Sequence, residues 1–116
     1  MKKIFSLIAI TLILVGCSLF SKKVEVKYEV TCTAIPNLVD IQTITAGDFC
    51  NFYDQSTPWI YTCESKTRSG NSAYIIAYNL QNHGTVTATI YIDDELLDED
   101  TCSEAYGGAC AYGTIE

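Results

Sequence analysis

The chain has 116 residues, with seven Lys or Arg against fourteen Asp or Glu, which gives a formal net charge of −7 at neutral pH. This length corresponds to a single domain. The acidic balance argues against nucleic acid as a partner and against direct adhesion to anionic lipid, because both require basic patches.

Residues 1–16 have the pattern of a secretory signal peptide. Met1-Lys2-Lys3 is basic, Ile4 to Leu14 is almost entirely apolar, and small residues precede Cys17. At a rise of roughly 1.5 Å per residue the apolar segment covers about 18 Å, which is short for a hydrocarbon core of about 30 Å. We therefore predict a cleaved signal helix over 1–16. The alternatives are an uncleaved N-terminal anchor or a Gly-Cys pair that arose by chance.

The last residues of this segment, Leu14-Val15-Gly16-Cys17, resemble the lipobox of bacterial lipoproteins. The resemblance implies a diacylglycerol on the sulfur of Cys17, cleavage before Cys17, and acyl chains such as palmitate as a membrane anchor. Two or more acyl chains hold a protein stably on a membrane. We expect residues 17–23 to form a lipidated tether and residues 24–116 to form a domain on the extracytoplasmic side of the cell envelope. The cleaved chain has a net charge of about −9, because Lys2 and Lys3 are removed.

After the tether the hydrophobic pattern has a period of two residues, which is typical of β-strands. Apolar and polar residues alternate from Val24 to Cys32, which predicts a half-buried strand with a charged outer face. Further short strands are predicted over 39–42, 49–53 and 59–64, with turns at Ile35-Pro36-Asn37, Gly47-Asp48 and Pro58. Residues 65–72 are polar and predict a loop.

The second half of the chain continues in the same way. Residues 73–80 are almost continuously apolar, which predicts a central strand covered on both faces. Alternation is clearest over 86–92, a reversal at 93–95 leads into a strand over 96–101, and the last strand is predicted over 109–115. Seven or eight short strands separated by turn residues predict an all-β fold, an immunoglobulin-like antiparallel β-sandwich.

Five cysteines follow the lipidation site, and export permits disulfides among them. The sequence-local pairs are Cys50 with Cys63 and Cys102 with Cys110, which leaves Cys32 free, although four cysteines allow three connectivities. A spare Cys32 also permits a redox or intermolecular role. Since the chain has no CxxC and no Cys/His cluster, we expect no metal site.

One charge feature stands out, a run of six carboxylates around the reversal at 93–95. It lacks the spacing and central glycine of an EF-hand, and alternate carboxylates along a strand point to opposite faces. A solvated hairpin is the favoured interpretation. The alternatives are a weak calcium site and a salt-sensitive docking patch for a basic partner, formed by Asp93, Asp94, Glu95, Asp98, Glu99 and Asp100.

Three aromatic residues, Phe52, Tyr53 and Trp59, lie close to a predicted loop. They are candidates for an exposed platform that binds a sugar, a lipid or a protein, although Trp59 as a core residue is the favoured interpretation. His83 is the only histidine and lies in the turn Asn82-His83-Gly84, with no serine motif to complement it. We therefore expect no catalytic residues, no cofactor and no enzymatic activity.

Several blocks of residues 24–115 resemble, in order and spacing, the MmpS-like proteins, which are small β-sandwich domains of bacterial envelopes. The resemblance implies a non-enzymatic accessory role beside an RND-type exporter. The chain departs from that pattern by having a lipobox in place of a membrane helix, Cys32 in place of a glycine, and Asp94 in place of a hairpin glycine. The matching blocks are Val26-Lys27-Tyr28-Glu29-Val30-Thr31, Val39-Asp40-Ile41, Thr57-Pro58-Trp59, the segment from Gly84 to Asp93, and Ala105-Tyr106-Gly107-Gly108-Ala109.

The leading hypothesis is therefore a lipid-anchored β-sandwich that presents one face to another envelope protein, for example an exporter. A second hypothesis is an inhibitory or ligand-binding lipoprotein whose acidic hairpin docks on a basic envelope protein such as lysozyme. A third is a structural or adhesive surface module. All three place the chain at a membrane through its lipid and away from nucleic acid.

Overall fold

The structure, a computed structural model, describes residues 22–68 and 70–115. The predicted signal peptide, Cys17 and nearly all of the tether lie outside the described residues. The described chain forms eight strands, namely β1 (Lys23–Cys32), β2 (Leu38–Thr45), β3 (Asp48–Ser56), β4 (Trp59–Lys66), β5 (Ser72–Asn79), β6 (Val86–Ile92), β7 (Glu95–Cys102) and β8 (Gly108–Thr114).

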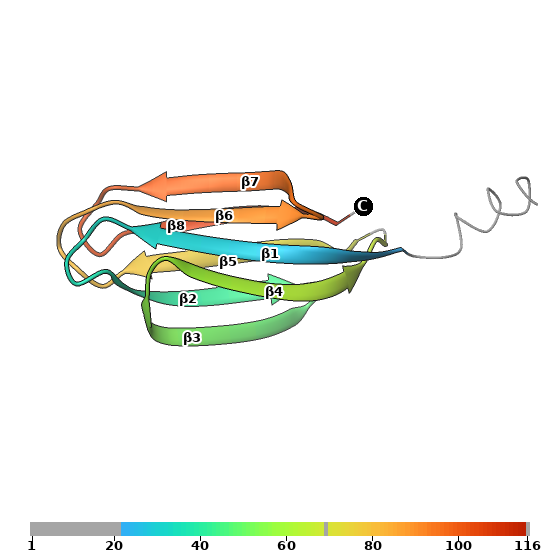
Figure 1. Cartoon of the computed structure of the whole chain (residues 1–116), viewed down its shortest axis with the longest axis horizontal. Helices are drawn as coiled ribbons and strands as arrows, with labels where there is room; N and C mark the ends of the chain where they lie inside the picture. The colour runs from blue at the N-terminus through green and yellow to red at the C-terminus, as the bar shows by residue number, and fades with distance from the viewer. Residues whose placement is uncertain (1–21, 69, 116) are drawn as a thin grey trace, which may run out of the picture.

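The strands form two antiparallel sheets of four strands each, packed face to face (Figure 1). Sheet A has the order β4-β1-β6-β7, and sheet B has the order β3-β2-β5-β8. The predicted all-β sandwich is therefore confirmed, with eight strands. The chain enters β1 and leaves β8 at the same end of the sandwich (Figure 1), where the N–H of Arg68 also donates to the carbonyl of Ile115.

Period-two alternation places the core between the two sheets. In β1 the side chains of Val26, Tyr28 and Val30 are fully buried, while the intervening charged side chains face outward. The inner face of sheet B contributes Val39 and Ile75 to the same cluster. Burial of these branched and aromatic side chains between two layers supplies the main driving force for folding.

One strand prediction was wrong, the covering of β5 on both faces. Ala73, Ile75 and Ala77 are fully buried, but Tyr78 on the opposite face is 46% exposed. The reason is that the sandwich has only two layers, so the outer face of each sheet has no third layer against it. The predicted polar loop is also shorter than 65–72, because β4 continues to Lys66 and β5 begins at Ser72.

The turns have the backbone conformations that their residues favour. Asp93 and Asp94 both have positive φ, 48° and 66°, as a two-residue hairpin turn that matches strand twist requires. Asp tolerates this conformation better than most residues. Gly84 has a φ of 90°, and a Cβ there would lie 2.6 Å from the backbone nitrogen of Ala34. Glycine is thus required at the Asn82-His83-Gly84 turn both by conformation and by space.

Candidate binding surfaces

The acidic hairpin is tied to neighbouring strands at its turn. The Asp93 carboxylate accepts a hydrogen bond of 2.8 Å from the backbone N–H of Glu25. The Asp94 carboxylate accepts one of 3.3 Å from the ammonium of Lys27. This hydrogen bond to Asp94 raises the pKa of Lys27 above its ordinary value, because it stabilises the charged ammonium. The turn is therefore attached to β1 by both of its residues.

Further along β7 the carboxylates hold the edge of the other sheet. The backbone N–H groups of Cys110 and Tyr112 on β8 donate to Asp100 and Asp98, at 2.8 and 2.9 Å. β8 is an edge strand, and these two N–H groups point away from β5, its only partner in the sheet. The carboxylates of β7 therefore close one side of the sandwich.

The fifth contact lies within sheet A, where the Glu99 carboxylate accepts a hydrogen bond from the Thr89 hydroxyl at 3.0 Å. Of the six carboxylates, Glu95 alone makes no hydrogen bond or ion pair with the described residues. The described residues also contain no group of three or more potential metal ligands. The structure thus gives five of the six a structural contact, and docking at this hairpin stays a prediction.

The three residues of the predicted aromatic platform do not lie on one surface. Phe52 and Trp59 face inward, with ring centroids 5.1 Å apart, and Phe52 lies 5.1 Å from Tyr61. Phe52, Trp59 and Tyr61 are all partly buried against the core. Tyr53 is 67% exposed on the other face of β3. The Phe52–Trp59–Tyr61 cluster joins β3 of one sheet to β4 of the other and closes the second side of the sandwich.

A small polar group lies beside this cluster, between the sheets. The Tyr28 and Thr45 hydroxyls are 2.6 Å apart, and the Cys63 thiol donates to the same Thr45 oxygen at 3.6 Å. Burial raises the pKa of Tyr28 to about 12 and also raises that of Cys63. A cavity of about 330 Å³ opens next to them and is lined in part by Cys50, Tyr61 and Cys63.

The five cysteines of the described region are free thiols in the structure. Cys50 and Cys63 both line the cavity between β3 and β4, so this predicted pair lies in one place without being bonded. The two cysteines of the other predicted pair, Cys102 and Cys110, lie on opposite sides of sheet B. Cys102 packs against the core, whereas Cys110 lies between the buried Ala109 and Ala111 and therefore points out of sheet B. A Cys102–Cys110 bridge does not fit this arrangement.

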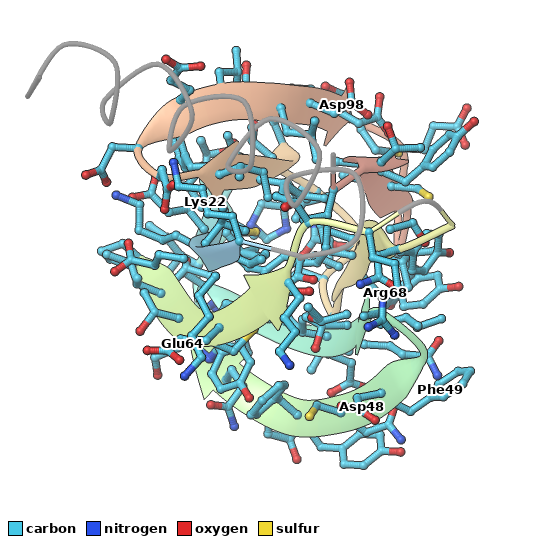
Figure 2. All side chains as sticks on the ribbon, turned by 90° about the vertical axis from the view of Figure 1, so that its right-hand side faces the viewer. Lys22, Asp48, Phe49, Glu64, Arg68 and Asp98 are labelled. Carbon is cyan, nitrogen blue, oxygen red and sulfur yellow. The ribbon has the colours of Figure 1, made fainter. Side chains whose placement is uncertain are left out.

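Several exposed aromatic side chains lie on the outer face of sheet B, which sequence reasoning did not identify. We call it the aromatic face. It carries Phe49 and Tyr53 on β3, Tyr74 and Tyr78 on β5, and Tyr112 on β8. Phe49, Tyr53 and Tyr112 are 64%, 67% and 66% exposed. Figure 2, which looks along the strands from the end where the chain enters, shows Phe49 directed away from both sheets.

A signal for this face was present in the residue types of β5. The outward side chains include Tyr74, Ile76 and Tyr78, whereas the inward ones include the smaller or branched Ala73, Ile75 and Ala77. Tyr is amphipathic and tolerates exposure, so a row of Tyr opposite Ala and Ile indicates an outer face. Counting Tyr as simply apolar hid this alternation.

Two further observations concern function. The exposed His83 accepts a hydrogen bond at Nε2 from the N–H of Ile35, 3.3 Å away, so its ring braces two turns. Residues 22–68 and 70–115 include no helix of the length and apolar character needed to span a membrane. Neither protein-family models nor curated proteins give a match to the sequence.

Proposed function

We propose that this protein is a lipid-anchored β-sandwich of the cell envelope that has no enzymatic activity and works by binding another envelope protein. The lipobox at Leu14-Val15-Gly16-Cys17 supports the anchor. The observation that carries the binding role is the aromatic face, which exposes large side chains from three of the four strands of sheet B. Exposed aromatic patches on a soluble domain mark interaction sites more often than chance.

The mechanism of such a protein is confinement. A tether over 17–23 reaches at most about 25 Å when fully extended, so the domain stays close to the membrane that holds its lipid. Restriction to a thin layer raises the effective concentration toward partners in the same membrane. An exporter of the RND type is the partner that the resemblance to MmpS-like proteins implies, and it belongs to this proposal.

The alternative of an inhibitor that docks through its acidic hairpin has less support. Asp93, Asp98 and Asp100 already accept hydrogen bonds from the domain's own backbone. A basic partner would have to share these carboxylates with the backbone N–H groups that they already bind. We therefore place the binding function on sheet B.

The anchor is tested by replacing Cys17 and following the protein through membrane fractionation. Wild type is expected in the membrane fraction, with a mass that matches a chain starting at an acylated Cys17. Cys17→Ala is expected to leave that fraction or keep its signal peptide, because no sulfur is available for the lipid. An unmodified Met1 terminus and a bare Cys17 in the wild type would refute the anchor.

The partner role is tested by cross-linking and capture of the full chain from membranes solubilised in detergent. An integral membrane exporter recovered with wild type, but not with a variant of the aromatic face such as Phe49→Ser/Tyr112→Ser, is the expected result. Recovery of a soluble basic enzyme instead would favour the inhibitory function. Recovery that does not depend on the aromatic face would contradict the assignment of binding to sheet B.

A further inference from the structure

The aromatic face contains one continuous row of large side chains across sheet B. Strand register places Phe49 opposite Ile44, Ile44 opposite Tyr74, and Tyr74 opposite Tyr112. These side chains point outward, because Thr43 and Thr45 on either side of Ile44 are buried, as are Ala73 and Ile75 around Tyr74. With strands about 4.8 Å apart, the row is roughly 14 Å wide.

Neighbouring contacts keep the rings of this face in place. The ring of Tyr78 lies over Gly108, where an added Cβ would come within 2.8 Å of it. A hydrogen bond with the Cys110 side chain, together with burial, raises the pKa of Tyr74 to about 12. Aromatic side chains that are already positioned lose little conformational freedom when a partner binds.

The charge on this face has a single sign. Asp40 lies on this face, between the buried Val39 and Ile41, and a register shift places Asp54 opposite it. Asp48 is on the other side of β3, where it lines the cavity with Cys50, and the four strands of sheet B contain no Lys or Arg. Of the five basic residues of the described chain, Lys22, Lys23, Lys27 and Lys66 lie in or next to the strands of sheet A. Arg68 lies in the connection between β4 and β5, at the end of the sandwich where its N–H bonds the carbonyl of Ile115. Ring faces carry negative potential, so the aromatic face combines two features that attract cations.

In sheet A a basic side chain of the protein itself, that of Lys27, contacts both an aromatic ring and a carboxylate. The ammonium of Lys27 lies 4.8 Å from the centroid of the Tyr91 ring and 3.3 Å from the Asp94 carboxylate. This distance is within the range of a cation–π interaction. The aromatic face of sheet B has the rings and the carboxylates without a basic residue in its own strands, so a cation there has to come from another molecule.

The shape of this surface favours a macromolecule over a small molecule. Cavities of about 310, 330 and 480 Å³ are lined by residues of the edges and of the end where the chain enters. Tyr74, Tyr78 and Tyr112 line none of these three cavities. Small ligands are usually enclosed in concave sites, whereas a flat face of this width suits a transient protein interface.

We propose that the aromatic face of sheet B is the docking surface of this domain, and that it binds a protein segment rich in Arg or Lys. Guanidinium or ammonium groups stack on the rings of Phe49, Tyr74 and Tyr112, and Asp40 and Asp54 complete the charge pairing. The proposal rests on the proposed function, which takes the partner to be a protein and assigns its binding to this face, and it adds the chemistry of the segment that is bound.

The test is an NMR titration of the full chain in nonionic detergent, with a ten-residue arginine peptide as the probe. Amide shifts are expected to change at Phe49, Tyr74 and Tyr112, and binding is expected to weaken when salt is raised. Phe49→Ser/Tyr112→Ser is expected to weaken binding about tenfold, because it removes two cation–π contacts. The neutral pair Asp40→Asn/Asp54→Asn is expected to weaken it several-fold.

The matched control is Ile60→Ser on the outer face of sheet A, a side chain that is 60% exposed and whose loss is expected to leave binding unchanged. Shift changes confined to residues 93–100, no response of sheet B to the peptide, or an equal response to a neutral oligosaccharide of six glucose units would each overturn the proposal. Repeating the titration with Cys17→Ala separates the docking surface from the lipid anchor, because loss of the lipid leaves this surface intact.

Discussion

At the scale of single residues, the carboxylates of β7 have a role that their charge alone did not suggest. Asp98 and Asp100 accept hydrogen bonds from backbone N–H groups of β8, which is an edge strand of the other sheet. A buried or edge donor left without an acceptor is costly. These two side chains therefore act as acceptors that complete a strand edge.

We predict that Asp100→Ala lowers the free energy of unfolding by about 1–2 kcal/mol, because the N–H of Cys110 loses its acceptor. Glu95→Ala is the matched control. It removes an exposed carboxylate that makes no hydrogen bond or ion pair within the described chain, and its effect is expected within about 0.5 kcal/mol. Urea denaturation of both variants gives the comparison. Equal midpoints for the two would show that the β7–β8 contact contributes nothing.

A second residue-scale prediction concerns Tyr28, whose pKa burial raises from 10 to about 12. Above pH 10 the unfolded chain releases the phenolic proton while the folded chain keeps it, so stability is present below pH 10 and falls as the pH approaches 12. The fall is on the order of 2 kcal/mol. In Tyr28→Phe, stability at pH 8 is expected to drop by about 1 kcal/mol through loss of the Thr45 contact.

The measurement is urea unfolding of both proteins at several pH values between 8 and 12. The gap between wild type and Tyr28→Phe is expected to close and then to change sign as the pH approaches 12, since the variant has no phenol to ionise at this position. A gap that stays constant up to pH 12 would contradict the assignment.

At the scale of strands, the two sides of the sandwich are closed by different means. The β7–β8 side uses carboxylates and backbone N–H groups, whereas the β3–β4 side uses the Phe52–Trp59–Tyr61 cluster. Adjacent residues of β3 therefore have opposite roles. Phe52 packs between the sheets, and Tyr53 lies on the aromatic face.

We predict that Phe52→Ala destabilises the domain by about 2–4 kcal/mol, through lost burial and lost ring contacts. Tyr53→Ala, one residue away, is expected to change stability by no more than about 0.5 kcal/mol. Thermal unfolding followed by circular dichroism separates them. If Tyr53→Ala were the more destabilising change, the orientation of β3 would have to be reversed.

The strands themselves were largely predictable from the sequence, and their partners were not. Alternation in 24–32 and 86–92 identified β1 and β6, because a half-buried strand imposes a period of two. The role of Asp98 and Asp100 depends on β8, which only the three-dimensional pairing brings beside them. Likewise, Phe52 and Tyr53 are both aromatic, and only strand register decides which of them faces the core. The aromatic face was missed for the related reason that Tyr is compatible with either side.

At the scale of the whole molecule, charge and apolar surface are divided between the two sheets. Basic residues of the described chain lie in or next to the strands of sheet A or, for Arg68, in the connection between β4 and β5, while sheet B combines exposed rings with Asp side chains. In Figure 2, Lys22 and Arg68 lie near the middle of the end where the chain enters, and Phe49 lies at the outer side of sheet B. The two broad faces of the sandwich are thus suited to different environments.

We predict that a chain beginning at Lys22 folds on its own, because the core cluster runs from Val24 to Ile115. It is expected to give a β-type circular dichroism spectrum and cooperative urea unfolding. A chain beginning at Lys27 is the control. It lacks Val24 and Val26, which are 6% and 0% exposed, and is expected to unfold. A disordered product from the Lys22 start would show that the preceding residues are needed for folding.

The closure of β8 by Asp98 and Asp100 also bears on how this protein would aggregate. Fibril growth requires a strand edge whose amide groups are open to an incoming chain, and on β8 two of these groups are already bonded to side chains. β3 forms the opposite edge of the same sheet. Its protection comes from Asp48 and from the left-handed backbone at Asp54, with a φ of 53°. Within sheet B, templated growth would therefore begin at β3, and loss of either aspartate would shorten the lag before fibrils form.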